Sequence, residues 1–335
     1  MTHWPSYIDP NSGDKLERKM NINKKFELTS KIGVTYPIIK GIPRILKDFN
    51  NYSLAFGEQW LKWRKTQLDS YSNTTITRDR LYRCLGSDIV SRLNKSKDPV
   101  DILEVGCGAG RFTEILLKFP NIRLTSIDFS SAVEANAINF PQDNHHRIIQ
   151  TDLMKLPFKP YQYDIVICLG VIQHTPNPEK AIKKIYKQVR PGGDLIIDHY
   201  TLDVRRLTKI TSNLIRPIIK RLSGKNRMKT IKFLVNIFFP LHRLLRNFPI
   251  LQKIFSRISP ILTYFHAYPE LNDNLQKEWS MLDTHDGLTD WYKHLRSQKQ
   301  IKKLLEEIES ESIQVWLGGN GIEARCKRPL DKAKI

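Results

Sequence analysis

The stretch Asp101–Thr113, DILEVGCGAGRFT, decides the fold. An apolar run of alternating character is interrupted by Glu104 and passes into Gly106, Gly108 and Gly110, after which apolar residues return at helical spacing. This pattern predicts a strand, a glycine-rich turn and a helix. Because glycine lacks a Cβ and tolerates positive φ, such a turn lets backbone amides and a helix N-terminus approach a ligand closely.

Four more apolar stretches follow in order. The second ends at Asp128, the third, Ile148–Gln150, leads to Asp152, and the fourth, Tyr163–Leu169, is nearly all apolar, as a strand buried on both faces is. A loop, a helix and a fifth strand at Leu195–His199 complete the series. Alternating strands and helices predict a parallel sheet between helices, with the acidic side chains at one edge.

Five segments in this order resemble the successive motifs of class I S-adenosylmethionine (SAM) dependent methyltransferases, type-11-like branch: EVGCGAGRF, SIDFS, TDLMKLPF, DIVICLGVIQH and VRPGGDLII. The resemblance implies an α/β fold, a Rossmann-like, seven-stranded, doubly wound sheet that an antiparallel hairpin closes. It also implies SAM as the cofactor and methyl transfer as the reaction.

The resemblance places the cofactor at the first half of the sheet. It implies that Asp128 binds the ribose hydroxyls, that Asp152 binds the adenine amino group, and that Leu153 packs on the ring. The full set of predicted cofactor-binding residues is Glu104, Gly106, Cys107, Gly108, Gly110, Asp128, Phe129, Asp152, Leu153 and Leu169. As alternatives, the two aspartates cap the segments that follow them, and Cys107 is a small apolar filler.

The glycine-rich turn differs from the dinucleotide-binding fingerprint. That fingerprint has G-x-G-x-x-G, but here the third glycine comes one residue early and Arg111 occupies the later position. Glu104, two residues before the first glycine, would repel a pyrophosphate but suits the sulfonium and ammonium charges of SAM. The turn therefore favours SAM over a nicotinamide cofactor.

Three residues are candidate bases: His174, Asp283 and His285. His174 follows the fourth strand at the carboxyl edge of the sheet, where a histidine can take a proton from a hydroxyl group or brace its loop. Asp283 and His285 lie in Glu278–His294, which is rich in carboxylates and aromatic residues. A similar LDTxD stretch accompanies this core in related methyltransferases, which implies that it lines the acceptor pocket; the alternative is a polar connector.

The sequence predicts five parts. The leader has strand-like pieces at Phe26–Thr29 and Val34–Ile39, and its end resembles that of a zinc-ribbon leader without the cysteines, so no metal site is predicted. Aromatic residues at helical spacing after the leader predict core packing more than cofactor contact. The parts are a leader (1–50), pre-core helices (51–98), the SAM-binding core (99–200), a helical insertion after the fifth strand (201–293) and the C-terminal part of the core (294–330).

The net charge of +20 is concentrated in the insertion. Residues 201–260 hold fourteen Lys or Arg and one acid, Asp203, so 14 − 1 = +13 of the excess lies there. Three stretches broken by prolines, 207–222, 231–241 and 244–258, have the pattern of basic amphipathic helices. The longest uncharged run has ten residues, interrupted by Pro240, and about 20 are needed to span a bilayer.

Three roles fit these helices. In order of preference, they form a lid on the core, a lid that also binds an anionic membrane surface, or a face that follows RNA phosphates. RNA comes last because stacking aromatic residues are not evident on the polar face.

The sequence thus predicts a SAM-dependent methyltransferase that acts on a small-molecule, glycan or lipid-linked acceptor, with O- or C-methylation favoured over N-methylation. The alternatives are an inactive SAM-binding or membrane-associated protein and an RNA methyltransferase. The N-terminus has no apolar run of signal-peptide length, so we expect a cytoplasmic protein, with peripheral attachment to the inner membrane face left open.

Overall fold

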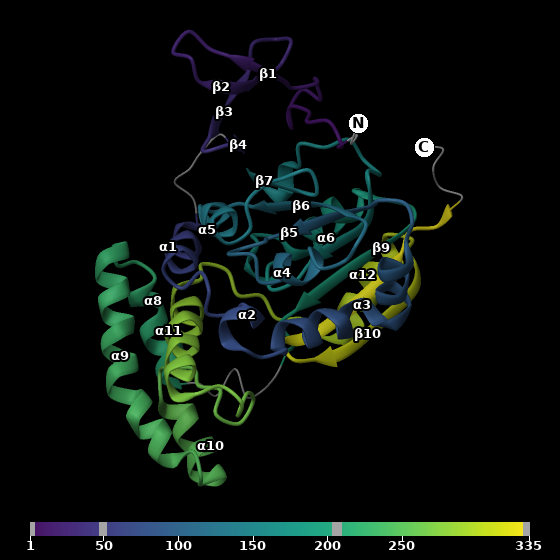
Figure 1. The fold of residues 1–335 in the computed structure, drawn as a ribbon. Coiled ribbons are helices and arrows are strands. Elements are labelled where there is room, and N and C mark those ends of the chain that lie inside the picture. Colours follow the sequence, from purple (N-terminus) through teal and green to yellow (C-terminus); the bar gives the residue numbers. More distant parts are fainter. Residues whose placement is uncertain (1–3, 47–51, 203–209, 331–335) are drawn as a thin grey trace.

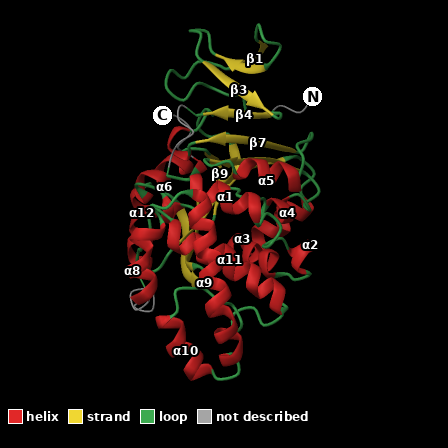
Figure 2. Ribbon diagram, turned by 90° about the vertical axis from the view of Figure 1, so that its left-hand side faces the viewer, coloured by secondary structure: helices red, strands yellow, loops and turns green. Residues whose placement is uncertain are grey.

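A single twisted sheet runs through the protein, with helices packed on both of its faces (Figures 1 and 2). The structure, a computed structural model, describes residues 4–46, 52–202 and 210–330. Within these residues the strand order is β1-β2-β3-β4-β7-β6-β5-β8-β9-β11-β10.

The centre of the sheet consists of parallel strands. From β5 the chain moves outward to β6 and β7, and then returns to the other side of β5 for β8 and β9. The order therefore reverses between β5 and β8, and open α/β sheets bind ligands beside the carboxyl ends of strands at such a switch point. The doubly wound sheet is confirmed, with β5 at Val100–Val105, β6 at Ile122–Asp128, β7 at His146–Thr151, β8 at Tyr163–Cys168 and β9 at Val189–His199.

Apolar residues of β5 point to both faces of the sheet, as a central strand requires. Leu103 and Val105 belong to one hydrophobic cluster, while Val100 and Ile102 belong to the other. The helices that cover these clusters are α3 (Ile76–Lys95), α4 (Thr113–Leu116), α6 (Pro178–Tyr186) and α12 (Gln298–Glu307). Helix α5 (Ala132–Asn139) packs in a third cluster with Ile42 of the leader and Ile148 of β7.

The predicted closing hairpin is present. Strands β10 (Glu311–Gly318) and β11 (Gly321–Lys327) pair antiparallel, and β11 also pairs antiparallel with β9.

The leader extends the sheet, so the predicted count of seven strands is wrong. Strands β2 (Phe26–Thr29) and β3 (Thr35–Ile39) lie close to their predicted positions, and β1 (Glu17–Met20) and β4 (Ile42–Ile45) were not expected. Strand β4 pairs in parallel with β7, so the sheet has eleven strands within the described residues. β1 is charged and fully exposed and β4 contains a proline, so neither shows the alternation of a strand. The zinc-ribbon origin of the leader stays a prediction.

The insertion is helical. It comprises α8 (Ile210–Ile219), α9 (Gly224–Leu245), α10 (Pro249–Ile258) and α11 (Asp273–Thr289). The sequence predicted an interruption at Pro240, but α9 continues through this residue, whose side chain lies on an exposed face of the helix. Most of Glu278–His294 is helix rather than polar connector. No helix in the described ranges is long and apolar enough to cross a membrane.

We predict that Arg44 ties the leader to the sheet. Its buried guanidinium donates to Gln150 at 2.9 Å and to Glu134 at 3.1 Å. Arg44→Ala removes the donor to Gln150 and one of the two cations that contact Glu134, and it is expected to lower the free energy of unfolding by about 3 kcal/mol in urea titration. The matched control is Lys40→Ala: this exposed lysine contacts the same Glu134 at 3.2 Å, and its loss is expected to cost less than about 1 kcal/mol. Equal effects would contradict a leader anchored by Arg44.

Candidate active site

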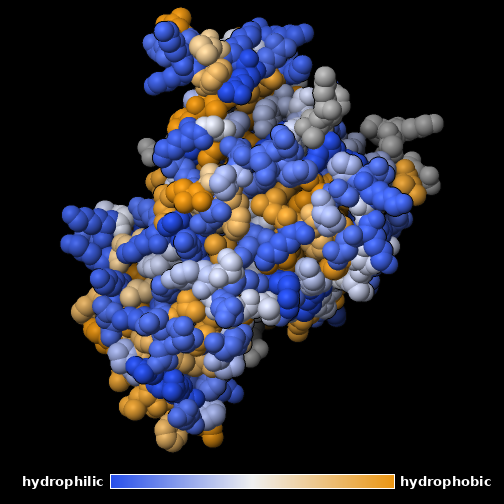
Figure 3. All heavy atoms as spheres, in the orientation of Figure 1, coloured by the Kyte–Doolittle hydropathy of each residue, from blue (hydrophilic) through white to orange (hydrophobic). Residues whose placement is uncertain are grey.

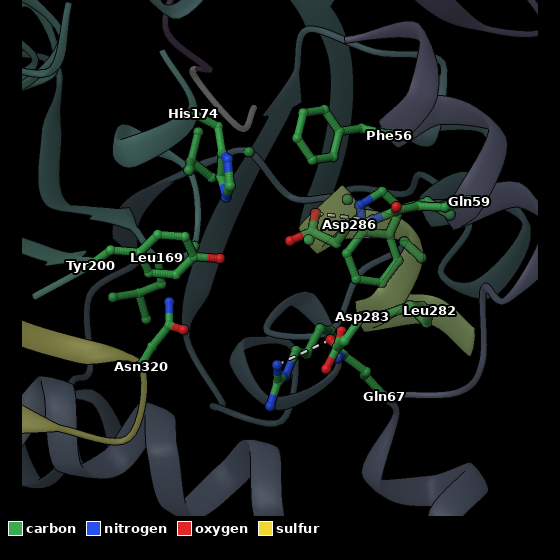
Figure 4. Close-up of a pocket in the computed structure, with 18 of the residues that line it drawn as sticks. Phe56, Gln59, Gln67, Leu169, His174, Tyr200, Leu282, Asp283, Asp286 and Asn320 are labelled. Atoms are coloured by element: carbon green, nitrogen blue, oxygen red, sulfur yellow. Dashed lines mark hydrogen bonds between the residues drawn. The ribbon is translucent and has the colours of Figure 1, made fainter. Parts of the chain in front are cut away.

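A cavity of about 930 Å³ opens at the switch point of the sheet (Figure 4). Its floor is formed by the ends of β5, β6, β7 and β8, and its far wall by helix α11. Helix α1 (Leu54–Lys62) lies next to α11 and lines the cavity together with it (Figure 4). Residues from the core, the pre-core helices and the insertion therefore meet in one chamber.

The glycine-rich turn forms part of this floor. Gly106, Cys107 and Gly108, which were predicted to bind the cofactor, line the cavity. Gly106 has a φ of +74°, and a Cβ there would stand 2.2 Å from Val171. A Cβ on Gly108, with a φ of +52°, would lie 3.2 Å from the Trp60 ring. Both positions thus favour glycine for conformation, and Gly106 also needs it for space.

Asp128 stands beside the turn at the end of β6. Its Oδ2 accepts a hydrogen bond from the Gly108 amide at 2.9 Å, and its Oδ1 accepts from the amide and hydroxyl of Ser130 at 2.8 and 2.7 Å. Burial raises the pKa of Asp128, although these hydrogen bonds oppose the shift. The carboxylate lines the cavity, so it both fixes the turn and presents oxygen to a ligand.

Asp152 lines the cavity at the end of β7. Its Oδ1 accepts from the Met154 amide at 2.8 Å and caps the short 3-10 helix Leu153–Lys155, while burial raises its pKa. Asp152 is therefore both the cap of this short helix and a residue of the cavity wall. The predicted neighbours Phe129, Leu153 and Leu169 also line the cavity.

Two predicted cofactor residues do not reach the cavity wall. Glu104 is buried beneath the turn, where its Oε2 accepts from Thr113 at 2.6 Å and from Ser126 at 2.7 Å. Burial raises its pKa to about 7 against these hydrogen bonds, and its Oε1 finds no hydrogen-bond partner among the described residues. Gly110 instead packs against Phe140, where a Cβ would come within 2.6 Å.

His174 lines the cavity opposite α11 (Figure 4). Its Nδ1 lies 3.1 Å from the Tyr292 carbonyl and 3.4 Å from Oδ2 of Asp290. Both are acceptors, so Nδ1 carries a proton and Nε2 is left as the basic nitrogen. Burial would lower the pKa of His174, but the hydrogen bond and charge of Asp290 raise it above its ordinary value.

Asp283 lines the cavity on α11 and is held by a chain of polar contacts. Its Oδ2 accepts from the Tyr264 hydroxyl and its Oδ1 from Nε2 of Gln67 at 3.3 Å. The same Gln67 accepts from Arg111 at 3.0 Å. Burial raises the pKa of Asp283 to about 7, and the nearby Asp286 adds to the shift, while Tyr264 and Arg111 lower it.

His285, the third candidate base, is turned away from the cavity. It is buried, its Nδ1 lies 2.7 Å from Oε1 of Gln59, and it is not among the residues that line the chamber. Burial lowers its pKa to about 3, helped by the charges of Arg227 and Lys62. The next residue on the helix, Asp286, faces the cavity instead (Figure 4).

The sequence missed much of the far wall. Phe56 and Trp60, expected to pack in the core, line the cavity with Gln59 and Tyr52 of the same segment. Arg80 and Arg111 also line it, and burial lowers the pKa of Arg111 to about 10. Helical spacing could show that the aromatic residues share a face, but not what that face covers. For Arg111, the sequence did offer a signal, because a bulky charged residue directly after the glycine-rich turn is unusual.

The residues present fit SAM. The glycine-rich turn brings the backbone of Gly106 and Gly108 to the cavity at positive φ, carboxylates stand at the ends of two adjacent strands, and Leu153 and Leu169 give apolar surface. Asp128 and Asp152 would hold the ribose and adenine, and the turn would pass the methionine portion. When bound, SAM supplies an electrophilic methyl group on a sulfonium.

Comparison with known proteins identifies the core. Residues 103–197 match the model of the family described as "Methyltransferase domain". The chain therefore contains a class I SAM-dependent methyltransferase domain, with SAM as its cofactor.

Curated relatives share this core with different acceptors. Malonyl-[acyl-carrier protein] O-methyltransferase of Priestia megaterium is 27% identical over 139 residues, 41% of this chain and 50% of its own. Ubiquinone biosynthesis O-methyltransferase of Pseudomonas entomophila is 30% identical over 98 residues, 28% of this chain and 41% of its own. The chain thus spans about half or less of the length of these relatives.

Among solved structures, the CurJ carbon methyltransferase is 13% identical and aligns over 83% of this chain and 60% of its own, with a TM-score of 0.46.

We predict that Asp128→Ala weakens SAM binding at least about tenfold, because hydrogen bonds to a charged group contribute about 1.5–3 kcal/mol each. Isothermal titration calorimetry measures the change, and thermal unfolding checks that the variant is folded. Asp98→Ala, an exposed aspartate before β5, is the matched control and should bind like the unaltered protein. Unchanged affinity in a folded Asp128→Ala protein would contradict the assigned cofactor site.

Proposed function

We propose that this protein transfers the methyl group of SAM to an oxygen or carbon nucleophile of a small-molecule, glycan or lipid-linked acceptor. The observation that supports the proposal is that one cavity contains two adjoining parts. The first part is the predicted cofactor site at the strand ends, and the second part is lined by polar side chains that contact one another. The second part is lined by Tyr264, Tyr268, Trp279 and Asp283.

Alignment and exclusion of water are the main work of such an enzyme. Methyl transfer is a displacement in line with the sulfonium, and fixing two reactants in a closed site can contribute about 7–11 kcal/mol. Leu169 supplies apolar wall on one side of the chamber, and Phe56 and Leu282 of α11 lie across from it (Figure 4). These side chains restrict water near the reacting atoms.

Asp283 is the proposed proton acceptor. A base works best when its pKa lies near the operating pH, and the pKa of this carboxyl is raised to about 7. Gln67 and Tyr264 fix its orientation, since each donates to one of its oxygens. In the reaction the acceptor hydroxyl or carbon acid would give its proton to this carboxylate, and the electron pair freed on the acceptor would form the new bond to methyl. The methyl–sulfur bond would break at the same time, with its electron pair remaining on the neutral sulfur.

His174 is the proposed second polar contact to the acceptor. Its Nδ1 is engaged by the Tyr292 carbonyl and Asp290, which leaves Nε2 to bind the acceptor or take its proton. Burial lowers the pKa of His174, but the hydrogen bond and charge of Asp290 raise it above its ordinary value, which makes the protonated, hydrogen-bond-donating form more favourable here than in an ordinary histidine. His285, outside the cavity, is the least suited of the three candidates.

The test of methyl transfer uses SAM labelled in its methyl group and whole-cell extract. We expect label in the aqueous or the organic-extractable small-molecule fraction, and much less of it with Asp128→Ala at limiting SAM. Label that ribonuclease releases would make the protein an RNA methyltransferase. Protein that binds SAM but transfers no label would be the inactive alternative.

We predict that Asp283→Asn lowers kcat for the labelled acceptor fraction by about 100-fold, because the amide cannot take a proton. In the unaltered enzyme, kcat/KM should rise as the pH passes about 7, and this rise should vanish in the variant. Glu278→Gln on the same helix, which contacts Thr66 and Tyr71, is the matched control. A variant with the normal rate and pH profile would remove Asp283 from the mechanism.

The same carboxyl gives a prediction that needs no acceptor. The folded-state pKa of about 7 lies above the value near 4 in the unfolded chain, so Asp283 contributes stability at low pH that is lost as the pH rises from about 4 through about 7. Relative to the unaltered protein, Asp283→Asn should gain in melting temperature between pH 5 and pH 8. A difference that is constant across this range would contradict the raised pKa.

A further inference from the structure

Helix α9 has two apolar stripes on different sides. The inner stripe, Ile231, Val235 and Phe239, is buried in a cluster with Leu288 of α11. An outer stripe, Phe233, Ile237, Leu241 and Leu244, is exposed, and Phe233 and Leu244 expose 62% and 71% of their surface. With about 3.6 residues per turn, the offset of two positions places the stripes on opposite sides of the helix. Packing within the described chain accounts for only one of them.

Helix α10 continues the outer stripe. Ile250, Leu251, Ile254 and Ile258 are all exposed, and Ile250 exposes 76% of its surface. The exposed Phe248 lies in the short turn between the two helices, so the stripes meet there. Figure 3 shows hydrophobic side chains along the outer edge of this helical pair, at the lower left of the view. Contiguous exposed apolar surface of this kind marks an interaction site.

The inner sides of α9 and α10 hold the pair together. Phe238 and Phe255 lie 6.2 Å apart between ring centroids, and Gln252 contacts the buried His242 at 2.9 Å. These contacts fix α9 and α10 relative to each other, so their exposed stripes form one surface.

Cations flank the apolar stripe. Residues 210–260 contain eleven Lys or Arg and no Asp or Glu. Lys225, Lys229 and Lys232 lie on one flank of the α9 stripe, and Lys253 and Arg257 on one flank of the α10 stripe. All five are exposed, and none forms an ion pair with another described residue. We call this surface, the outer stripes with these five cations, the basic apolar face.

We propose that the basic apolar face binds the surface of an anionic lipid bilayer, with α9 and α10 lying in the plane of the interface. Its chemistry is that of interfacial helices, which insert apolar side chains below the headgroups while Lys and Arg contact anionic lipids. The proposal does not depend on methyl transfer and concerns residues outside the cavity.

Charge and hydrophobicity separate this partner from others. A second copy of the chain would bring two cationic faces together without carboxylates between them, and like charges opposed at an interface are unfavourable. RNA would pair with the lysines but would leave the isoleucine and leucine side chains uncovered. An anionic bilayer satisfies the apolar and the cationic parts together.

The test is flotation of the full chain with vesicles of phosphatidylcholine alone and of phosphatidylcholine mixed with phosphatidylglycerol. We expect binding to the anionic vesicles, at least about tenfold weaker binding to the neutral ones, and release by high salt. Equal recovery with both vesicle types, or no recovery with either, would overturn the proposal.

Matched variants locate the binding. Lys225→Gln/Lys229→Gln/Lys232→Gln should weaken binding roughly tenfold or more. Lys299→Gln/Lys302→Gln/Lys303→Gln on α12, with the same change in charge, should not. Phe233→Ser/Ile237→Ser should also weaken it, whereas Leu317→Ser, another exposed apolar residue, should leave it unchanged. Equal losses in test and control variants would overturn the proposal.

Two further outcomes identify other partners. If the protein is a dimer in vesicle-free buffer and Phe233→Ser/Ile237→Ser makes it monomeric, the basic apolar face binds a second copy of the chain. Retention of RNA by the lysines, without flotation, would assign it to nucleic acid. Either result would overturn membrane binding, and SAM titration of the same variants would show that the cofactor site is intact.

Discussion

The hydrogen bonds between the glycine-rich turn and the end of β6 are the constraint on which the site depends. The amides of Gly106 and Cys107 donate to the Ile127 carbonyl at 2.7 and 2.9 Å, and the Gly108 amide donates to Asp128. These contacts join the carboxyl ends of two adjacent strands and fix the floor of the cavity. Glu104 supports the same turn from below through Thr113 and Ser126. It therefore shapes the cofactor site without lining it.

The roof of the cavity depends on contacts between segments far apart in the sequence. Gln59 of α1 donates to Asp286 of α11 and accepts from His285, and the Trp279 indole donates to the Thr66 carbonyl. The pre-core segment and the insertion thus hold each other over the core. Neither alone would close the chamber, which explains why the polar end of the insertion is helical and buried rather than a connector.

The parts of the structure that could be predicted are those that local sequence patterns determine. Alternating apolar stretches with glycines or acids at their ends located the central strands, and the same positions located Asp128 and Asp152 at the cavity. The short leader strands lacked alternation and were found only in part. Gln59, Gln67 and Tyr264 could not be predicted, because their role arises from tertiary contacts between parts that no local pattern relates. Similarly, the choice between Asp283 and His285 depends on the rotation of α11, which periodicity alone does not fix.

The insertion shows why the alternatives of lid and membrane surface could not be separated by sequence. A helix with one apolar stripe buries it, and the opposite face is polar. Helix α9 carries Ile231 and Val235 on one side and Phe233 and Ile237 on the other, so its apolar residues are spread around the helix. The inner stripe packs on α11, as a lid on the core requires. A lid alone does not explain why the outer stripe is apolar and exposed. The two roles are therefore complementary: the same helix can cover the cavity wall with one side and meet a partner with the other.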